Sequence, residues 1–220
     1  EGLKDQNGLK ENYAAFLSEL RAALPEDKSL YVCVQPGPYN DGYDFRALGE
    51  SCDKVILMAH DYRPPASDLH VGSVPSENFA VTPFYLVYDA LTEITDPETG
   101  VADLSKVALA VSMDTTGFPI DQEGRVTAAQ YVRPSLETLS QRLAQSDTVV
   151  AYSPTARNPY AVYTDEAGAR YQVWYEDGQS IADKMALAKM FGINGLSIWR
   201  LGNIPTYDNY DVWSAVLALR

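Results

Sequence analysis

The sequence predicts an α/β fold built around a parallel sheet, and three observations point to it. Short apolar runs alternate along the chain with segments of helical periodicity, as expected where helices connect parallel strands. The chain has 220 residues, 46% of them hydrophobic, which is enough for one sizeable core. Residues 193–198 form a largely apolar run behind a helix that ends at Gly192, which is typical of a buried parallel strand.

The first part of the chain is expected to hold two helices and two strands. Apolar residues at helical spacing predict a helix that Pro25 ends, and Pro-Gly-Pro at 36–38 closes the strand that follows. A second apolar run leads directly into His60-Asp61-Tyr62. In chain order, we expect a helix from 9 to 24, a strand at 30–34, a short helix around 45–48 and a strand at 54–59.

The rest of the framework begins after a loop at 63–76 that is rich in Pro, Ser and Gly. We expect a helix at 82–94, a strand at 107–113, the last strand at 192–198 and a closing helix at 212–219.

Between the third and the last framework strand the pattern changes to short antiparallel strands, which predicts an α+β insertion. It should contain a helix at 135–144 and strands at 148–152, 160–164 and 170–176, with a hairpin turn at 165–168. Ser180, with Asp183 three residues later, is expected to cap a helix running to about 191. The predicted domains are therefore a framework of residues 1–116 and 178–220 and an insertion of residues 117–177.

Composition excludes several classes of function. Asp and Glu total 30 against 17 Lys and Arg, a formal charge of −13, so nucleic acid would be repelled and a neutral or weakly charged substrate is favoured. No segment has the apolar length that membrane insertion requires. The two His and two Cys match no zinc-binding spacing, and we expect neither a metal nor a cofactor. Cys33 and Cys52 are expected to be buried free thiols, although spacing alone leaves a disulfide open.

Three stretches carry residues suited to a sugar site. The second strand ends in Met-Ala-His-Asp-Tyr at 58–62, the insertion ends in Val-Trp-Tyr-Glu-Asp at 173–177, and the last strand ends in Trp-Arg-Leu-Gly at 199–202. Active sites of α/β barrels lie at the carboxyl ends of the strands. A Trp at such an end can form a flat apolar floor for a ring-shaped ligand.

In this order the three stretches resemble glycoside hydrolase family 18, the chitinase-like family. They are most similar to its bacterial spore-cortex and cell-wall branch, which acts on polymers that contain N-acetylglucosamine. The resemblance implies a (β/α)8 TIM barrel with an α+β insertion after the seventh strand. Since four framework strands are predicted where a full barrel has eight, the chain is expected to be the C-terminal half, about strands 5–8 with their helices.

The resemblance also implies the chemistry. The family's fourth strand ends in D-x-x-D-x-D-x-E, whose last Glu is the general acid, and Glu1 stands where that residue is expected. The substrate's own 2-acetamido carbonyl attacks the anomeric carbon, so that no protein nucleophile is needed. The acid protonates the leaving oxygen.

The remaining roles are carried over by position. Asp61 would lie near the acetamide, and Trp199 would form the floor. His60 stands where the family usually has Tyr, and its reach and pKa differ from those of a phenol; Tyr62 is next along the chain and would partly substitute. Met58 belongs to the same strand end, and Trp174 is a candidate sugar-lining aromatic. Each has a structural alternative: a solvated terminus for Glu1, a hydrogen-bonded strand end for His60, a turn cap for Asp61, packing for Trp199 and hairpin core for Trp174.

The implied function is hydrolysis of chitin or peptidoglycan by the parent protein, with this chain alone expected to be inactive. One alternative is a non-catalytic sugar-binding module, a chitinase-like lectin on the same fold, and another is an unrelated α/β domain. The expected partner is an N-acetylglucosamine-containing polysaccharide or oligosaccharide. Open sheet edges predict self-association, and the resemblance implies location outside the cell, at the bacterial cell surface or on the spore.

Overall fold

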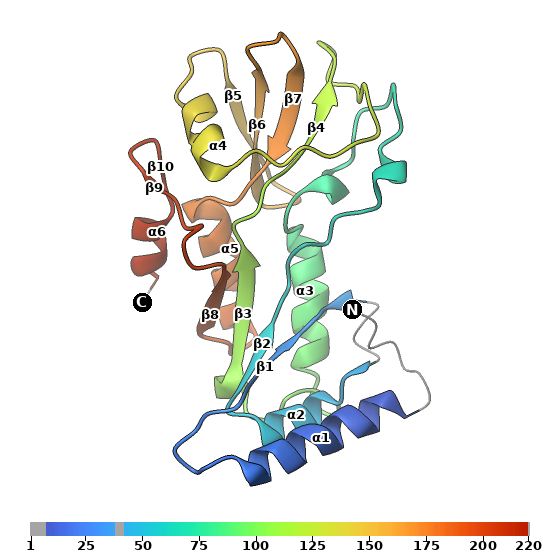
Figure 1. Ribbon diagram of the computed structural model, residues 1–220, viewed down its shortest axis with the longest axis vertical. Helices are drawn as coiled ribbons and strands as arrows, with labels where there is room; N and C mark the ends of the chain where they lie inside the picture. Colours follow the sequence, from blue (N-terminus) through green and yellow to red (C-terminus); the bar gives the residue numbers. More distant parts are fainter. Residues whose placement is uncertain (1–7, 38–41, 220) are drawn as a thin grey trace. The chain divides into compact units, whose positions relative to one another are not determined.

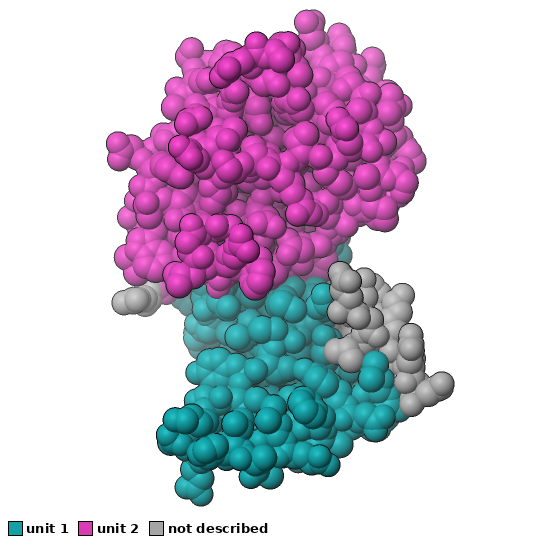
Figure 2. All heavy atoms as spheres, viewed as in Figure 1, with its two compact units in different colours: residues 1–59, 86–111, 185–197 teal, residues 60–85, 112–184, 198–220 magenta. Residues whose placement is uncertain are grey.

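The computed structural model describes residues 8–37 and 42–219 (Figure 1). The chain divides into two compact units, which Figure 2 shows in different colours. The first comprises residues 1–59, 86–111 and 185–197, and the second comprises residues 60–85, 112–184 and 198–220.

A four-stranded sheet forms the framework. It consists of β1 (Tyr31–Val34), β2 (Lys54–Leu57), β3 (Val107–Ser112) and β8 (Gly195–Trp199), in the order β1-β2-β3-β8 (Figure 1). β2 pairs in parallel with both β1 and β3. The predicted α/β class with a parallel sheet is therefore confirmed.

The strands of this sheet differ in burial. All six residues of β3 are buried, whereas β1 and β2 alternate between buried and more exposed positions. Continuous burial is typical of a parallel strand covered on both faces. Of β1, β2 and β3, only β3 is buried along its whole length. In β8, residues 195–198 are only half-buried, so the expectation of a fully buried last strand was wrong.

Helices α1 (Leu9–Ala23) and α3 (Phe84–Ile94) lie close to their predicted bounds, and α1 ends two residues before Pro25. α2 (Phe45–Ser51) begins after Asp44, whose carboxylate accepts a hydrogen bond from the Ala47 backbone N–H at 3.0 Å. The described residues also form the helices α5 (Gly178–Met190) and α6 (Trp213–Leu217) and the 3-10 turns η2 (Ala66–Asp68), η3 (Glu77–Phe79) and η4 (Leu104–Lys106).

The start of α5 corrects a prediction. Ser180 lies inside the helix, and Asp177 precedes it. The Ser180 N–H donates to Asp177 Oδ1 at 2.8 Å, and the Asp177 N–H donates to Ser180 Oγ at 2.9 Å. The capping pair is therefore Asp177 and Ser180, since an Asp three residues before a Ser satisfies the same free backbone donors.

The second unit contains an antiparallel sheet with strand order β4-β7-β6-β5. β5 (Val149–Ser153), β6 (Asn158–Thr164), β7 (Arg170–Trp174) and helix α4 (Leu136–Leu143) confirm the predicted strands and helix. A small hairpin is formed by β9 (Thr206–Tyr207) and β10 (Tyr210–Asp211).

The sequence did not predict β4 (Thr116–Ile120), which pairs with β7. It contains Gly117 and Pro119, both of which argue against a central strand. β4 lies at an edge of the sheet, where a missing backbone donor is tolerated. Gly117 is required because a Cβ there would lie 2.6 Å from Val173 Cγ2 and 2.8 Å from the Gln172 carbonyl oxygen.

Both cysteines are free thiols; Cys52 is buried as predicted, whereas Cys33 is exposed, contrary to the prediction. Within the described ranges, no helix combines the length and apolarity needed to cross a bilayer.

Candidate functional site

Five residues at strand ends form what we call the strand-end cluster: His60, Asp61, Asp114, Trp199 and Arg200. They follow or end β2, β3 and β8, and all five belong to the second unit. The backbone joins two of these ends, because the Met113 N–H donates to the Trp199 carbonyl oxygen at 2.8 Å.

His60 and Asp61 form a contact pair. His60 Nδ1 lies 3.0 Å from Asp61 Oδ2, and the imidazole is 6% exposed where the carboxylate is 41% exposed. Asp61 has a positive φ of 61°, which is uncommon outside glycine and is often found at functional sites. The other ring nitrogen, His60 Nε2, is buried without a hydrogen-bond partner among the described residues. A buried polar atom of this kind is costly unless a ligand satisfies it.

Asp114 is a functional candidate that the sequence analysis missed. Burial raises the pKa of its carboxyl above the usual range, and the negative charge of Asp61 raises it further. The charges of Arg200 and His60 act on this pKa in the opposite direction. Two carboxyls that influence each other in this way are typical of sites that handle protons. The sequence contained a signal for Asp114, because this residue lies just after β3 in the same way that His60 and Asp61 lie just after β2.

Trp199 is exposed enough for a sugar ring to stack on it. Its indole is 51% exposed, so it is not sealed in a core. The Trp199–Arg200 peptide bond is cis. Arg200 is also exposed and follows the indole directly.

The other predicted site residues lie in different settings. Tyr62 is half-buried in the second unit. Met58 belongs to the first unit, where its backbone N–H donates to the Val34 carbonyl oxygen at 2.9 Å. Glu1, the expected general acid, lies outside the described residues.

Trp174 is placed where it cannot line a sugar site. It is 2% exposed and belongs to an apolar cluster with Phe79 and Phe118. Its ring centroid lies 4.8 Å from that of Tyr160. The expectation of a sugar-lining indole is therefore wrong, because the end of β7 faces the core of the antiparallel sheet's unit.

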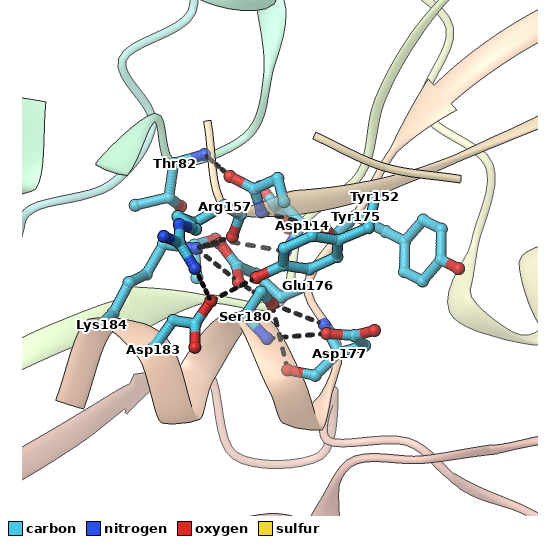
Figure 3. A network of polar contacts seen from close by, with 12 residues as sticks. Thr82, Asp114, Tyr152, Arg157, Tyr175, Glu176, Asp177, Ser180, Asp183 and Lys184 are labelled. Carbon is cyan, nitrogen blue, oxygen red and sulfur yellow. Dashed lines mark hydrogen bonds and ion pairs between the residues drawn. The ribbon is translucent and has the colours of Figure 1, made fainter. Parts of the chain in front are cut away.

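A second polar group in the same unit is wholly buried, and we call it the buried network: Glu176, Lys184 and their polar partners. The Lys184 Nζ lies 2.8 Å from both carboxylate oxygens of Glu176, and both side chains are 0% exposed (Figure 3). Ser180 Oγ donates to Glu176 Oε2, and Lys184 also donates to the Arg157 carbonyl oxygen at 3.4 Å. Burial lowers the pKa of Lys184, and the Glu176 charge opposes that shift.

The periphery of the buried network is more open. The Tyr152 hydroxyl donates to Asp183 Oδ2 at 2.8 Å, and Arg157 Nη1 lies 3.4 Å from the same oxygen (Figure 3). Burial and the contact with Asp183 raise the pKa of Tyr152. The Tyr210 hydroxyl donates to the Glu176 carbonyl oxygen at 2.7 Å. Because Glu176 and Lys184 are matched by each other and by other described residues, the network holds the end of β7 to α5, and neither of these two side chains is exposed to a ligand.

Within residues 8–37 and 42–219, no group of three or more His, Cys, Asp or Glu side chains is arranged to hold a metal ion. The strand-end cluster itself contains an imidazole, two carboxyls, a guanidinium and an indole.

The family model for glycosyl hydrolases family 18 matches residues 3–203. The chain belongs to glycoside hydrolase family 18. The match spans both the parallel sheet and the antiparallel insertion, and it confirms the resemblance inferred from the three strand-end and insertion stretches.

Curated relatives point to the spore-cortex branch. The cortical fragment-lytic enzyme of Bacillus subtilis (strain 168) is 29% identical over 188 residues, which are 84% of this chain and 38% of the relative. The di-N-acetylchitobiase of Mus musculus is 46% identical over 65 residues, 26% of this chain and 18% of the relative. The chain spans less than half the length of the cortical fragment-lytic enzymes that it matches.

Solved structures show the same fold. The spore cortex-lytic enzyme SleL of Bacillus cereus has a TM-score of 0.67 and 24% identity over 94% of this chain and 44% of that one. A chitinase from Chromobacterium violaceum has a TM-score of 0.71 and 23% identity over 96% of this chain and 62% of that one.

Proposed function

We propose that the protein containing this chain hydrolyses β-linked N-acetylglucosamine polymers, chitin or peptidoglycan, by a retaining, substrate-assisted mechanism. The observation that carries the proposal is the strand-end cluster, in which two interacting carboxyls, a buried imidazole and an exposed indole follow neighbouring strands. The names of the relatives, cortical fragment-lytic enzyme and di-N-acetylchitobiase, support a substrate with this amino sugar.

The chain would supply part of a TIM barrel, about strands 5–8. The four-stranded sheet and the limited share of each relative that the chain covers support this assignment. The general acid would then be Glu1. This chain by itself is expected to be inactive, because it spans less than half the length of the cortical fragment-lytic enzymes that it matches.

In the proposed reaction the acetamide must be held while its carbonyl oxygen attacks the anomeric carbon. Asp61 would accept a hydrogen bond from the acetamide N–H, which favours the attacking form. Asp114 keeps negative charge close to Asp61 and, when protonated, can itself donate. Trp199 presents an apolar face to the sugar ring and excludes water there.

His60 stands in place of the tyrosine that the family usually has, and its geometry suggests which hydrogen bonds it would make to the substrate. With Asp61 ionised, the proton of a neutral imidazole belongs on Nδ1, which leaves Nε2 as an acceptor. Nε2 would then accept from a hydroxyl group of the sugar, whereas an imidazolium would donate to the acetamide carbonyl oxygen. Either contact would satisfy the buried nitrogen that lacks a partner.

The test is turnover of a chromogenic chito-oligosaccharide by the full-length protein. We expect hydrolysis with retention of the β-anomer, seen by NMR before mutarotation, and its loss in Asp61→Asn. Absence of hydrolysis in a folded protein would remove the enzyme claim.

The alternative, a non-catalytic sugar-binding module, is favoured by one observation, the imidazole in the place of the usual phenol. It predicts Trp199-dependent binding of the same oligosaccharide without turnover.

Two further predictions from the sequence belong to this proposal. β1 and β8 are the outer strands of the framework sheet, so we expect self-association of the isolated chain through these edges. A strictly monomeric species in light scattering would contradict it. Location outside the cell, at the bacterial surface or spore, is proposed from the family resemblance.

A further inference from the structure

A cavity of about 410 Å³ lies at the end of the antiparallel sheet where β4 ends and β6 turns into β7 (Figure 1). Ile120 of β4 and Thr164 of β6 both pair with Arg170, the first residue of β7, and all three contribute to the lining. The turn after β4 adds three polar side chains: Asp121, Gln122 and Thr127. The volume is within the range of about 300–1,000 Å³ that is usual for small-molecule sites.

This cavity is separate from the strand-end cluster, although both belong to the second unit. None of the five residues of that cluster is among the described residues that line the cavity. The strand β4 lies between the two, since it begins at Thr116 and ends at Ile120. At about 3.4 Å per residue, its ends are roughly 14 Å apart. A ligand in the cavity would therefore leave the strand-end cluster free.

Arg170 has an unsatisfied hydrogen-bond donor at this cavity. Its Nε is buried and has no hydrogen-bond partner among the described residues. In the same part of the chain, no acidic side chain forms an ion pair with its guanidinium. Leaving a buried donor unpaired is unfavourable, and a ligand oxygen in the cavity would pair with it.

Asp121 supplies an acceptor in the same cavity. Its Oδ1 accepts hydrogen bonds from the backbone N–H groups of Glu123 at 3.0 Å and Arg125 at 2.8 Å, which hold the turn in place. Its Oδ2 makes no hydrogen bond to a described residue, so it can accept one from a ligand.

The β6–β7 turn is held in the same way. Asp165 Oδ1 accepts hydrogen bonds from the backbone N–H groups of Ala167 at 3.0 Å and Ala169 at 2.8 Å. Because both turns beside the cavity are fixed by their own aspartates, a ligand would pay little to order them.

The mixture of charges favours a neutral ligand. An anion would be repelled by the Asp121 carboxylate, and a cation would be repelled by the Arg170 guanidinium. A hydroxyl group both donates and accepts, so neighbouring hydroxyls of one sugar can pair with the donor and the acceptor together. Apolar surface for the C–H groups of a sugar ring is also present in the lining, from Pro119, Ile120 and Ala169.

We propose that this cavity is a second sugar-binding site, which holds a neutral sugar residue of the polymer away from the bond that is cleaved. A chain bound there would raise the concentration of substrate at the strand-end cluster, because the second contact becomes intramolecular. A disaccharide cannot reach both places and would gain nothing. The inference rests on the proposed function for the identity of the polymer.

The experiment compares long and short substrates of the full-length protein. The ratio to measure has as numerator the initial rate on the better of two polymers, colloidal chitin and purified peptidoglycan. Its denominator is the initial rate on a chromogenic chitobioside. Arg170→Met removes a charged hydrogen-bond donor and should lower the ratio about tenfold, with little change in the chitobioside rate.

Two further variants make this result specific. Arg125→Met is the matched control, since Arg125 is an exposed arginine of the same turn that does not line the cavity, and it should leave the ratio unchanged. Thr127→Val keeps the shape of an exposed lining residue and removes only its hydroxyl, so the fold should tolerate it. It should lower the ratio about threefold, because hydrogen bonds between neutral groups are roughly half as strong as charged ones.

The outcomes separate the two proposals. Ratios for Arg170→Met and Thr127→Val that equal the ratio for Arg125→Met would overturn the second site while the glycosidase stands. Calorimetric binding of acetate that is lost in Arg170→Met would identify an anion site and overturn the sugar assignment.

If the native protein hydrolyses none of these substrates, the proposed function fails, and co-sedimentation with the same two polymers decides the inference. The second site holds if Arg170→Met binds the polymer about tenfold more weakly than Arg125→Met does. It falls if these two variants bind alike.

Discussion

The two polar groups of the second unit differ in how their hydrogen bonds are satisfied. In the buried network, Glu176 and Lys184 have no exposed surface and each charge meets its partner at 2.8 Å. In the strand-end cluster, His60 Nε2 has no partner among the described residues and Trp199 is half exposed. Burial lowers the pKa of the Lys184 amine in the buried network, and it raises the pKa of the Asp114 carboxyl in the strand-end cluster.

This difference distinguishes polar groups that stabilise the fold from polar groups that are available to a ligand. A buried charge pair that satisfies itself stabilises one arrangement of the chain and has nothing left for a ligand. An unsatisfied buried group costs folding free energy, and a substrate that pairs with it would recover that cost. Four substitutions, three of them with control variants, test this comparison.

Breaking the buried pair should have the largest effect. Lys184→Met leaves the Glu176 carboxylate buried without its countercharge, and we expect a loss of about 3–5 kcal/mol in the free energy of unfolding, measured by urea denaturation. The control is the double variant Lys184→Met with Glu176→Leu, which should recover most of that loss because no charge remains buried. A single-variant loss below about 1 kcal/mol would show that the pair is not structurally important.

Removing the indole should affect activity rather than stability. Trp199→Ala in the full-length protein should reduce kcat/KM about 100-fold, since a sugar without its floor is misplaced relative to the acid. The free energy of unfolding should change by about 0.5 kcal/mol, because the side chain is half exposed. Trp199→Phe keeps a flat apolar face and should retain much of the activity. A large loss of stability in Trp199→Ala would indicate packing instead.

Neutralising Asp114 should raise stability. The pKa of Asp114 in the folded protein lies above its usual value. Its contribution to the stability of the fold is therefore present at low pH and is lost as pH rises through the folded pKa, because ionising a partly buried carboxyl is unfavourable. Asp114→Asn should therefore melt at a higher temperature than the native protein at pH 7, and the difference should vanish in acid.

Asp96→Asn is the opposite control for this variant. Hydrogen bonds from Thr99 and the Glu98 N–H lower the pKa of Asp96, so stability is present above its ordinary pKa and lost as pH falls through the folded one. The Asn variant should melt lower at pH 7. Calorimetric scans from pH 3 to 7 would show both signs, and a destabilised Asp114→Asn would place Asp114 with the buried network.

The smallest effect is expected at the rim of the buried network. Arg157→Gln removes a partly exposed ion pair with Asp183, which should cost less than about 1 kcal/mol by urea denaturation. A cost similar to that of Lys184→Met would mean that the network extends to the surface as one unit.

Much of the framework could be predicted because its signals are local. Pro25 ends α1 wherever that helix packs, and the alternation of apolar runs with helical segments implies a parallel sheet. The turn at 165–168 likewise predicted the β6–β7 hairpin. β4 was missed because Gly117 and Pro119 argue against a strand until the neighbouring edge position is known.

For the site, the sequence by itself determined the chemical types, namely an imidazole, a carboxyl and an indole at strand ends, and through them the family. Tertiary structure decided which of these side chains stay open. Trp174 and Trp199 both end strands, yet one is sealed in an apolar cluster and the other is half exposed. Asp114 joins Asp61 only because β2 and β3 are neighbours in the sheet. Burial and charge pairing depend on residues far away in the chain, and so no local pattern could decide them.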